Sequence, residues 1–247
     1  MLDYDDLHKL WYRAHTAGSP IKYIRNAIVF NELEKLLPGN TLDAGCGTGE
    51  YSIFLAKKGH KVTVFDPSPF AIKTLMESGG DELGIEAQIK TINGFRSSGK
   101  FDNIISIEIF EHLTSGQEAI CKLYSFLKHD GIMILSVPAA PFLYSQSDKI
   151  SGHYRRYSKK RIKDLLERVH FKKKKIIGYG FPVLFLYLLF KKIFLDKILI
   201  KHFSTPSISK EMDKRFRLLS SLYPVILSVD RLNLPFWNIG YVIKCTK

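Results

Sequence analysis

The residues best suited to chemistry lie in the glycine-rich segment LDAGCGTG, which occupies positions 42–49. Its three glycines let the backbone turn tightly and approach a ligand without an obstructing Cβ. The segment is not the full dinucleotide fingerprint, because no glycine stands at position 50, and it lacks the lysine of a phosphate-binding P-loop. Asp43 and Glu50 flank the glycines, so the loop would repel a pyrophosphate and suit a cationic ligand.

Asp66 ends the next apolar run, 21 residues after Gly45. An acidic side chain at this distance from a glycine loop is placed to accept hydrogen bonds from both ribose hydroxyls of a nucleoside. Together, the loop and this aspartate predict a site for a nucleoside that carries positive charge.

A second segment with chemical capacity, SGHYRRY, occupies positions 151–157 and follows Asp148. Arg155 and Arg156 could grip a phosphate or carboxylate in bidentate fashion, and Tyr157 could stack or donate a hydrogen bond to the same substrate. His153 is the best candidate for a base that acts on a hydroxyl acceptor. Alternatively, the segment is a structural clasp in which the arginines pair with acidic side chains, Asp148 or Glu111. Both interpretations stay open.

His112 is a second candidate base, since an unperturbed imidazole has a pKa of about 6.5. The pair that it forms with Glu111 could equally be structural. The sequence shows no convincing cluster of metal ligands, and no metal is expected. Three scattered cysteines, at positions 46, 121 and 245, have no C-x-x-C spacing, so neither a disulfide framework nor a structural zinc site is expected. A reducing, cytoplasmic location fits, and the acidic N-terminal stretch does not resemble a secretory signal.

Strands and helices alternate around these segments. Apolar runs of β type occur at 41–44, 61–65, 87–91, 103–107 and 132–137, with helical patterns at 51–58, 70–77 and 117–127. We expect two helices within 4–36, a loop at 139–158, a basic helix at 159–169 and a strand at 171–177. A further helix at 210–232 and a closing strand at 240–245 follow. Such alternation predicts an α/β fold whose parallel sheet is covered on both faces and binds ligands at the carboxyl ends of its strands.

The motifs resemble those of the class I S-adenosylmethionine-dependent methyltransferases. LDAGCGTG and VTVFDPSPFAI match the first two motifs of that family, and FDNIISIEIFEHL (101–113) and LKHDGIMILSVP (127–138) match the fourth- and fifth-strand signatures. The segment GHxRRY is similar to a subgroup of type-11 and type-12 methyltransferases associated with lipid or cell-surface glycan metabolism. The resemblance covers about residues 20–178. It implies a Rossmann-like, mostly parallel seven-stranded sheet with a helical insertion before the last strand, and S-adenosylmethionine as the cofactor.

The resemblance also implies roles for individual residues. The glycines would cradle the methionine and ribose portions of the cofactor, Asp43 would lie near its amino group, and Asp66 would bind its ribose. Asn93 would belong to the adenine pocket, although the family often has an aspartate there. The full set of expected cofactor contacts is Asp43, Gly45, Cys46, Gly47, Gly49, Asp66, Pro67, Asn93, Ile107 and Arg25. The implied organisation is N-terminal helices (1–36), the cofactor domain (37–178), a basic and apolar insertion (179–239) and the closing strand (240–247).

Charge and hydropathy bear on the substrate. Residues 1–140 carry a formal charge of −3, whereas residues 141–247 carry +16. This asymmetry favours an anionic partner, such as a phosphate-bearing substrate, a nucleic acid or an acidic membrane surface, over a merely solvated face. The longest uncharged run near the apolar segment at 181–195 has 15 residues, too few to span a bilayer. This segment could lie at a membrane interface, roof a pocket for a greasy substrate, pack against a second subunit or form a buried helix.

These observations favour an enzyme that methylates a small or lipid-linked acceptor, at oxygen, in the cytoplasm or peripherally at a membrane. Methylation of RNA or protein is a rival, although the Asn/Asp-Pro-Pro-aromatic signature of amino-directed nucleic-acid methyltransferases is missing after residue 107. A non-catalytic scaffold with the same fold is a second alternative. Neither the acceptor nor the oligomeric state can be read from the sequence, and a homodimer remains open.

Overall fold

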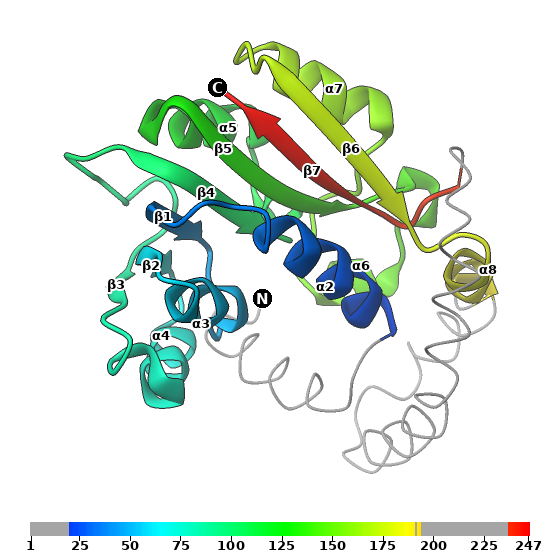
Figure 1. The fold of residues 1–247 in the computed structure, drawn as a ribbon. Helices are drawn as coiled ribbons and strands as arrows, with labels where there is room; N and C mark the ends of the chain where they lie inside the picture. The colour runs from blue at the N-terminus through cyan, green and yellow to red at the C-terminus, as the bar shows by residue number, and fades with distance from the viewer. Residues whose placement is uncertain (1–19, 191, 194–236) are drawn as a thin grey trace.

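A computed structural model describes residues 20–190, 192–193 and 237–247. These residues form a seven-stranded sheet with helices packed against it (Figure 1). The strands are β1 (Asn40–Ala44), β2 (Lys61–Asp66), β3 (Glu86–Ile89), β4 (Phe101–Ile107), β5 (Leu127–Pro138), β6 (Lys173–Tyr179) and β7 (Gly240–Thr246). Their order is β3-β2-β1-β4-β5-β7-β6. Strand β7 runs antiparallel to both of its neighbours, whereas the pairs formed among β1–β5 are parallel. The predicted mostly parallel, seven-stranded sheet is confirmed.

The central strands are buried on both faces, because successive apolar residues along each of them point to opposite faces of the sheet. Ile104 and Leu135 pack into one core with residues of α5 (Gly116–Phe126) and α7 (Lys159–Glu167). Their chain neighbours Ile105 and Ile134 face the opposite core. That second core is completed by α2 (Pro20–Leu33), α3 (Glu50–Lys57), α4 (Pro69–Leu75) and α8 (Val183–Phe190). The sheet is therefore a rigid platform that holds the loops at its carboxyl edge.

Three helices begin at serine N-caps. Ser68, Ser115 and Ser158 each accept a hydrogen bond from the backbone N–H three residues later, at the starts of α4, α5 and α7. Such a cap satisfies one of the N–H groups that a helix leaves unpaired at its start. A π-helical turn, η1 (Met76–Gly80), continues α4.

The topology reverses between β1 and β4, because the chain passes from β1 to β2 and β3 on one side and then returns to β4 on the other. The loops that follow β1, β2, β4 and β5 consequently meet at one edge of the sheet, where such folds bind their ligands. After β4 comes a single 3-10 turn, η2 (Phe110–His112), and after β5 come a second such turn, η3 (Pro141–Leu143), and the short helix α6 (Gln146–Ile150).

The structure differs from the sequence prediction mainly after β5. The segment 139–158, predicted as a loop, contains η3 and α6, because Ser145 and Asp148 form a capping box that starts a helix. Strand β6 extends two residues beyond its predicted end, because its ladder with β7 continues to Tyr179. The predicted helix at 210–232 and the first of the two predicted N-terminal helices lie outside the described residues, as does most of the predicted insertion at 179–239. In the described part of the chain, no helix has the length and apolar character needed to cross a membrane.

Candidate functional site

The glycine loop joins β1 to α3 at the carboxyl edge of the sheet. Gly45, Gly47 and Gly49 all have positive φ, at 77°, 52° and 81°, a region that other residues rarely adopt. Two of them are also held by packing. A Cβ on Gly45 would lie 2.4 Å from the Ile109 side chain, and one on Gly49 would lie 2.0 Å from the Leu75 side chain. The sequence therefore needs glycine here both for the turn and for close contact with Ile109, just after β4, and with Leu75 of α4.

Asp66 ends β2 directly beside this loop. Its Oδ2 accepts a hydrogen bond from the Gly47 backbone N–H at 2.9 Å, and its Oδ1 accepts one from the Ser68 backbone N–H at 2.9 Å. The two backbone donors fix the orientation of the carboxylate. Because each oxygen of an ionised carboxylate can accept a second hydrogen bond, the group can still bind a pair of hydroxyls.

The loop and Asp66 line a cavity of about 600 Å³. Most of the sequence-predicted site residues lie on its wall: Arg25, Gly45, Cys46, Gly47, Asp66, Pro67, Asn93, Ile107, His112 and His153. Predicted residues that do not line it are Asp43, Gly49, Arg155, Arg156 and Tyr157. Wall residues that sequence reasoning did not assign to the site include Lys22, Thr48, Tyr51, Phe65, Glu108 and Ile109.

Asp43 lies beneath the glycine loop, not in the cavity. Its side chain is 1% exposed, and its Oδ2 accepts a hydrogen bond from Ser52 Oγ on α3 at 2.5 Å. Burial raises the pKa of Asp43 to about 7; the Ser52 hydrogen bond opposes this rise and the nearby Asp66 charge adds to it. Asp43 therefore braces the loop against α3.

Helix α2 covers the cavity with polar residues on one face. Arg25 Nη1 lies 3.3 Å from Glu108 Oε2, and Lys22 Nζ lies 3.0 Å from Glu50 Oε2 at the start of α3. Burial acts to lower the pKa of Arg25, but the Glu108 charge and Tyr51 raise it above its ordinary value, so the guanidinium stays charged. Its Nε is buried and has no hydrogen-bond partner among the described residues. The Arg25 guanidinium is thus a buried, charged hydrogen-bond donor in the cavity wall.

Glu108 directly follows β4 and has a φ of 56°. This conformation costs a residue with a side chain about 1–3 kcal/mol and persists where the surroundings enforce it. Here the Glu108 backbone N–H donates to the Ser136 carbonyl at 3.2 Å, and Ser136 Oγ donates to Glu108 Oε1 at 2.8 Å. The strained turn brings the Glu108 side chain to the cavity wall, opposite Arg25.

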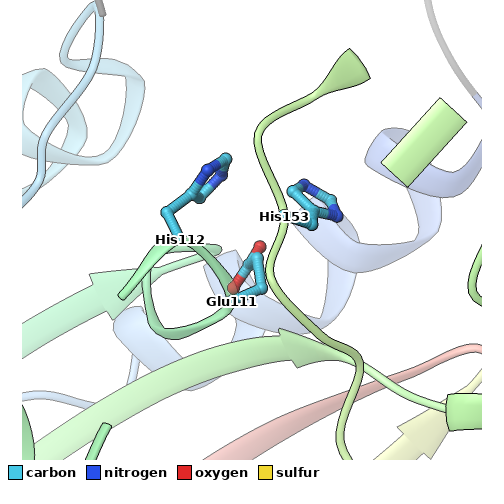
Figure 2. Close-up of side chains that lie close together, drawn as sticks. All are labelled: Glu111, His112 and His153. Carbon is cyan, nitrogen blue, oxygen red and sulfur yellow. The ribbon is translucent and has the colours of Figure 1, made fainter. Parts of the chain in front are cut away.

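Glu111, His112 and His153 gather at the same edge (Figure 2). Potential metal-ligand atoms of these three side chains all lie within 4.8 Å of one another. The two imidazole rings meet edge to face, with centroids 4.7 Å apart and planes at 88°. Glu111 is fully buried, and burial, followed by the Glu108 charge, raises its pKa well above the ordinary range. The sequence did not predict this cluster, because His153 follows His112 by 41 residues and no local spacing links them.

The segment 148–157 forms a clasp that carries His153 to this position. The Asp148 carboxylate lies 3.0 Å from both His153 Nδ1 and Arg156 Nε. Burial would raise the pKa of Asp148, but hydrogen bonds from His153 and Arg156 and the Arg156 charge lower it to about 2. The Tyr157 hydroxyl donates to the Phe110 carbonyl at 2.9 Å, and the Tyr154 N–H donates to the Glu111 carbonyl at 2.8 Å. The clasp thus binds the η2 turn directly.

The predicted substrate-binding residues belong to this clasp. Arg156 pairs with Asp148, Tyr157 is 1% exposed, and Arg155 donates through Nη2 to the Thr114 carbonyl at 3.0 Å. Their side chains hold the loop in place and lie outside the cavity. The geometry corresponds to the clasp alternative, in which Arg156 takes Asp148 as its partner. The buried Glu111 has no hydrogen-bond partner among the described residues.

Comparison with known proteins gives consistent similarities. Residues 14–175 match the model of a family described as a methyltransferase domain. Ubiquinone biosynthesis O-methyltransferase of Rickettsia canadensis (strain McKiel) is 32% identical over 120 residues, which are 47% of this chain and 49% of that protein. Malonyl-(acyl-carrier protein) O-methyltransferase 1 of Ilyobacter polytropus is 28% identical over 99 residues, 39% of this chain and 37% of that protein. The chain spans about half the length, or less, of these curated relatives.

Solved structures share the fold. Phosphoethanolamine N-methyltransferase 2 of Haemonchus contortus, solved in complex with S-adenosyl-L-methionine, aligns with a TM-score of 0.64. The alignment covers 100% of this chain and 60% of that one, at 13% sequence identity. At this identity the likeness concerns the arrangement of the sheet and its helices.

Proposed function

The chain belongs to the methyltransferase-domain family, and from that premise we propose that it binds S-adenosylmethionine and methylates a hydroxyl oxygen of a small or lipid-linked acceptor. One observation supports this proposal above all. A single cavity of about 600 Å³ joins the glycine loop and Asp66 to Glu111, His112 and His153. A nucleoside-binding end and a chemically reactive end therefore share one cavity.

The residues present fit the cofactor. The cavity lies within the range of about 300–1,000 Å³ that is usual for small-molecule sites. Asp66 offers two oriented acceptors for the ribose hydroxyls, and the unpartnered Nε of Arg25 offers a buried donor for a carboxylate. Glu108 adds negative charge, which suits a sulfonium. The cofactor would supply a methyl group already activated on that sulfonium, so the chain mainly has to align the acceptor.

His112 and His153 are the proposed catalytic residues at the acceptor end. Both line the cavity, and the clasp fixes His153 through Asp148. An oxygen acceptor agrees with the names of the two curated relatives, which are both O-methyltransferases. Imidazoles at this position can hold an acceptor hydroxyl and take part in removing its proton.

A lipid-linked acceptor is supported by the surface around α8. Large apolar side chains are about half exposed on this helix and beside it: Phe142, Leu186, Phe190, Ile193 and Trp237. The basic charge of residues 141–247 would favour an anionic bilayer surface. We propose that the enzyme acts in the cytoplasm, peripherally attached to a membrane.

Labelled S-adenosylmethionine tests the acceptor class. The purified protein is incubated with the labelled cofactor and an extract of the native cell, which is then separated into lipid, RNA, protein and small-molecule fractions. The proposal predicts label in the lipid or small-molecule fraction, released by ether cleavage or ester hydrolysis. Label confined to RNA or protein would replace this acceptor with a macromolecular one, and no incorporation with any fraction would favour a scaffold.

A further inference from the structure

The Glu111 carboxylate is the least satisfied polar group at the site. Its side chain is fully buried, and neither Oε1 nor Oε2 has a hydrogen-bond partner in the described part of the chain. Buried carboxylates are costly unless they are hydrogen-bonded, paired with a cation or bound to a metal. Arg25 is engaged by Glu108, and Arg156 is engaged by Asp148. Neither neighbouring guanidinium therefore forms an ion pair with Glu111.

Two imidazoles complete a ligand set around this carboxylate. Figure 2 shows the Glu111 carboxylate directed toward the space between the His112 and His153 rings. Ligand atoms about 2.1 Å from one ion in a tetrahedral arrangement stand about 3.4 Å apart. Since the atoms of the cluster lie within 4.8 Å of one another, they must approach by roughly 1.4 Å at most.

The contact with Asp148 gives His153 the tautomer that a metal needs. Asp148 is held ionised by Arg156 and can only accept hydrogen bonds, so the proton of His153 lies on Nδ1, 3.0 Å from Asp148 Oδ1. The neutral ring then carries its lone pair on Nε2. A carboxylate behind a metal-binding histidine is the usual arrangement that fixes the ring and increases its basicity.

We propose that Glu111, His112 and His153 bind a divalent transition-metal cation, such as Mn²⁺ or Zn²⁺, that holds the acceptor oxygen for methylation. Two imidazoles and one carboxylate suit these ions and leave coordination positions for other ligands. The role of the cation in methylation rests on the proposed function, whereas the binding of the cation does not. A cation lowers the pKa of a hydroxyl bound to it. The hydroxyl proton then passes to solvent, the oxygen lone pair forms the bond to the methyl carbon, and the electron pair of the broken C–S bond stays on sulfur.

Mn²⁺ binding measured without any acceptor tests the site. The metal-free full chain is titrated with Mn²⁺ alone, and free Mn²⁺ is followed by electron paramagnetic resonance. The proposal predicts one saturable site that Glu111→Gln and His153→Gln each weaken at least tenfold. Glu118→Gln and His129→Gln are the matched controls, because both residues are exposed and lie outside the cluster. Circular dichroism confirms that each variant is folded. Because the two ligand variants lie on different segments, one of them still tests the site if the other does not fold.

The outcomes separate the metal site from the methyltransferase function. No saturable Mn²⁺ binding at millimolar concentration, or binding that both ligand variants leave unchanged, would overturn the metal site. Calorimetry with S-adenosylmethionine on the same metal-free protein reports on the cofactor independently. Mn²⁺ binding that depends on Glu111, without cofactor binding, would preserve the metal site and remove the proposed function. Cofactor binding and turnover that persist in the presence of a chelator and in Glu111→Gln would preserve the proposed function and remove the metal from it.

Discussion

Oδ1 of Asp148 lies 3.0 Å from Nδ1 of His153, and this contact joins the clasp to the reactive end of the cavity. The same carboxylate accepts from Arg156 Nε and from the Ser145 backbone N–H. One buried anion therefore fixes the start of α6, the arginine of the clasp and the orientation of the histidine. The sequence segment that was predicted to grip a substrate holds His153 at the wall of the cavity.

The ion pair of the clasp can be tested by a double-mutant cycle. Because Asp148 and Arg156 are 2% and 10% exposed, removal of one partner leaves the other charge buried, at a cost of about 3–5 kcal/mol. We expect Asp148→Asn and Arg156→Leu each to lower the free energy of unfolding in urea. The double variant should lose at least about 1 kcal/mol less than the sum of the two. Strictly additive losses would mean that the pair does not couple.

The buried carboxylate of Asp43 predicts a pH dependence of stability. Its pKa is about 7 in the folded protein, against an ordinary value of 3.8. The folded chain therefore holds this proton more tightly than the unfolded chain, so the contribution of Asp43 to stability is present below about pH 4 and is lost as pH rises toward 7. At about 1.4 kcal/mol per pKa unit, the full change is on the order of 4 kcal/mol.

Asp43→Asn isolates this effect, because the amide oxygen can still accept from Ser52. Urea unfolding of the wild type and the variant between pH 4 and 8 should show the variant gaining relative stability as pH rises. Asp81→Asn, at an exposed position, is the matched control and should follow the wild type. A pH-independent difference between Asp43→Asn and the wild type would contradict the raised pKa.

Two glycines that share a positive φ allow the cost of backbone strain to be separated from the cost of packing. Gly49 and Gly59 have φ values of 81° and 85°, but a Cβ at Gly49 meets buried Leu75, whereas a Cβ at Gly59 has nothing within 4 Å. Both alanine substitutions incur the cost of a positive φ. Gly49→Ala should cost about 1–3 kcal/mol more, through overpacking. Equal urea midpoints for the two variants would show that contact with Leu75 is unimportant.

The apolar surface near α8 predicts membrane binding. Phe190 is 54% exposed on this helix, and Ile89 is 51% exposed on the edge strand β3. Because the two side chains are similarly exposed, Phe190→Asp and Ile89→Asp form a matched pair of variants. The wild type and Ile89→Asp should sediment with anionic phosphatidylglycerol vesicles, and Phe190→Asp should bind at least about threefold less. Added salt should weaken binding of the wild type. Equal sedimentation of both variants would exclude α8 from the contact.

Features determined by short segments of sequence were predictable. The strands, the glycine loop and the placement of Asp66 depend on local alternation and on backbone geometry, and the structure shows each close to its predicted position, although β5 begins five residues earlier and β6 ends two residues later than predicted. Arg25 was inferred from family resemblance, and it lines the cavity.

Features formed by segments far apart in sequence were not predictable. Whether Asp43 points into the cavity or beneath the loop depends on Ser52, which the loop pattern does not specify. In the sequence, the polar face of α2 looks like the solvated face of an ordinary surface helix. Only the structure shows that Glu50 and Glu108 form ion pairs with it. The cluster around Glu111 requires the clasp to bring His153 beside it, so the spacing of its three side chains exists only in three dimensions.

Titration of the purified chain with S-adenosylmethionine, by calorimetry, tests the central claim most directly. If Asp66 holds the ribose at the end of β2, the wild type binds one equivalent and Asp66→Asn binds about 10- to 100-fold more weakly, a loss of about 1.4–2.7 kcal/mol. Asp81→Asn should match the wild type. No heat of binding at millimolar cofactor, or an affinity that Asp66→Asn leaves unchanged, would contradict the assignment of this cavity.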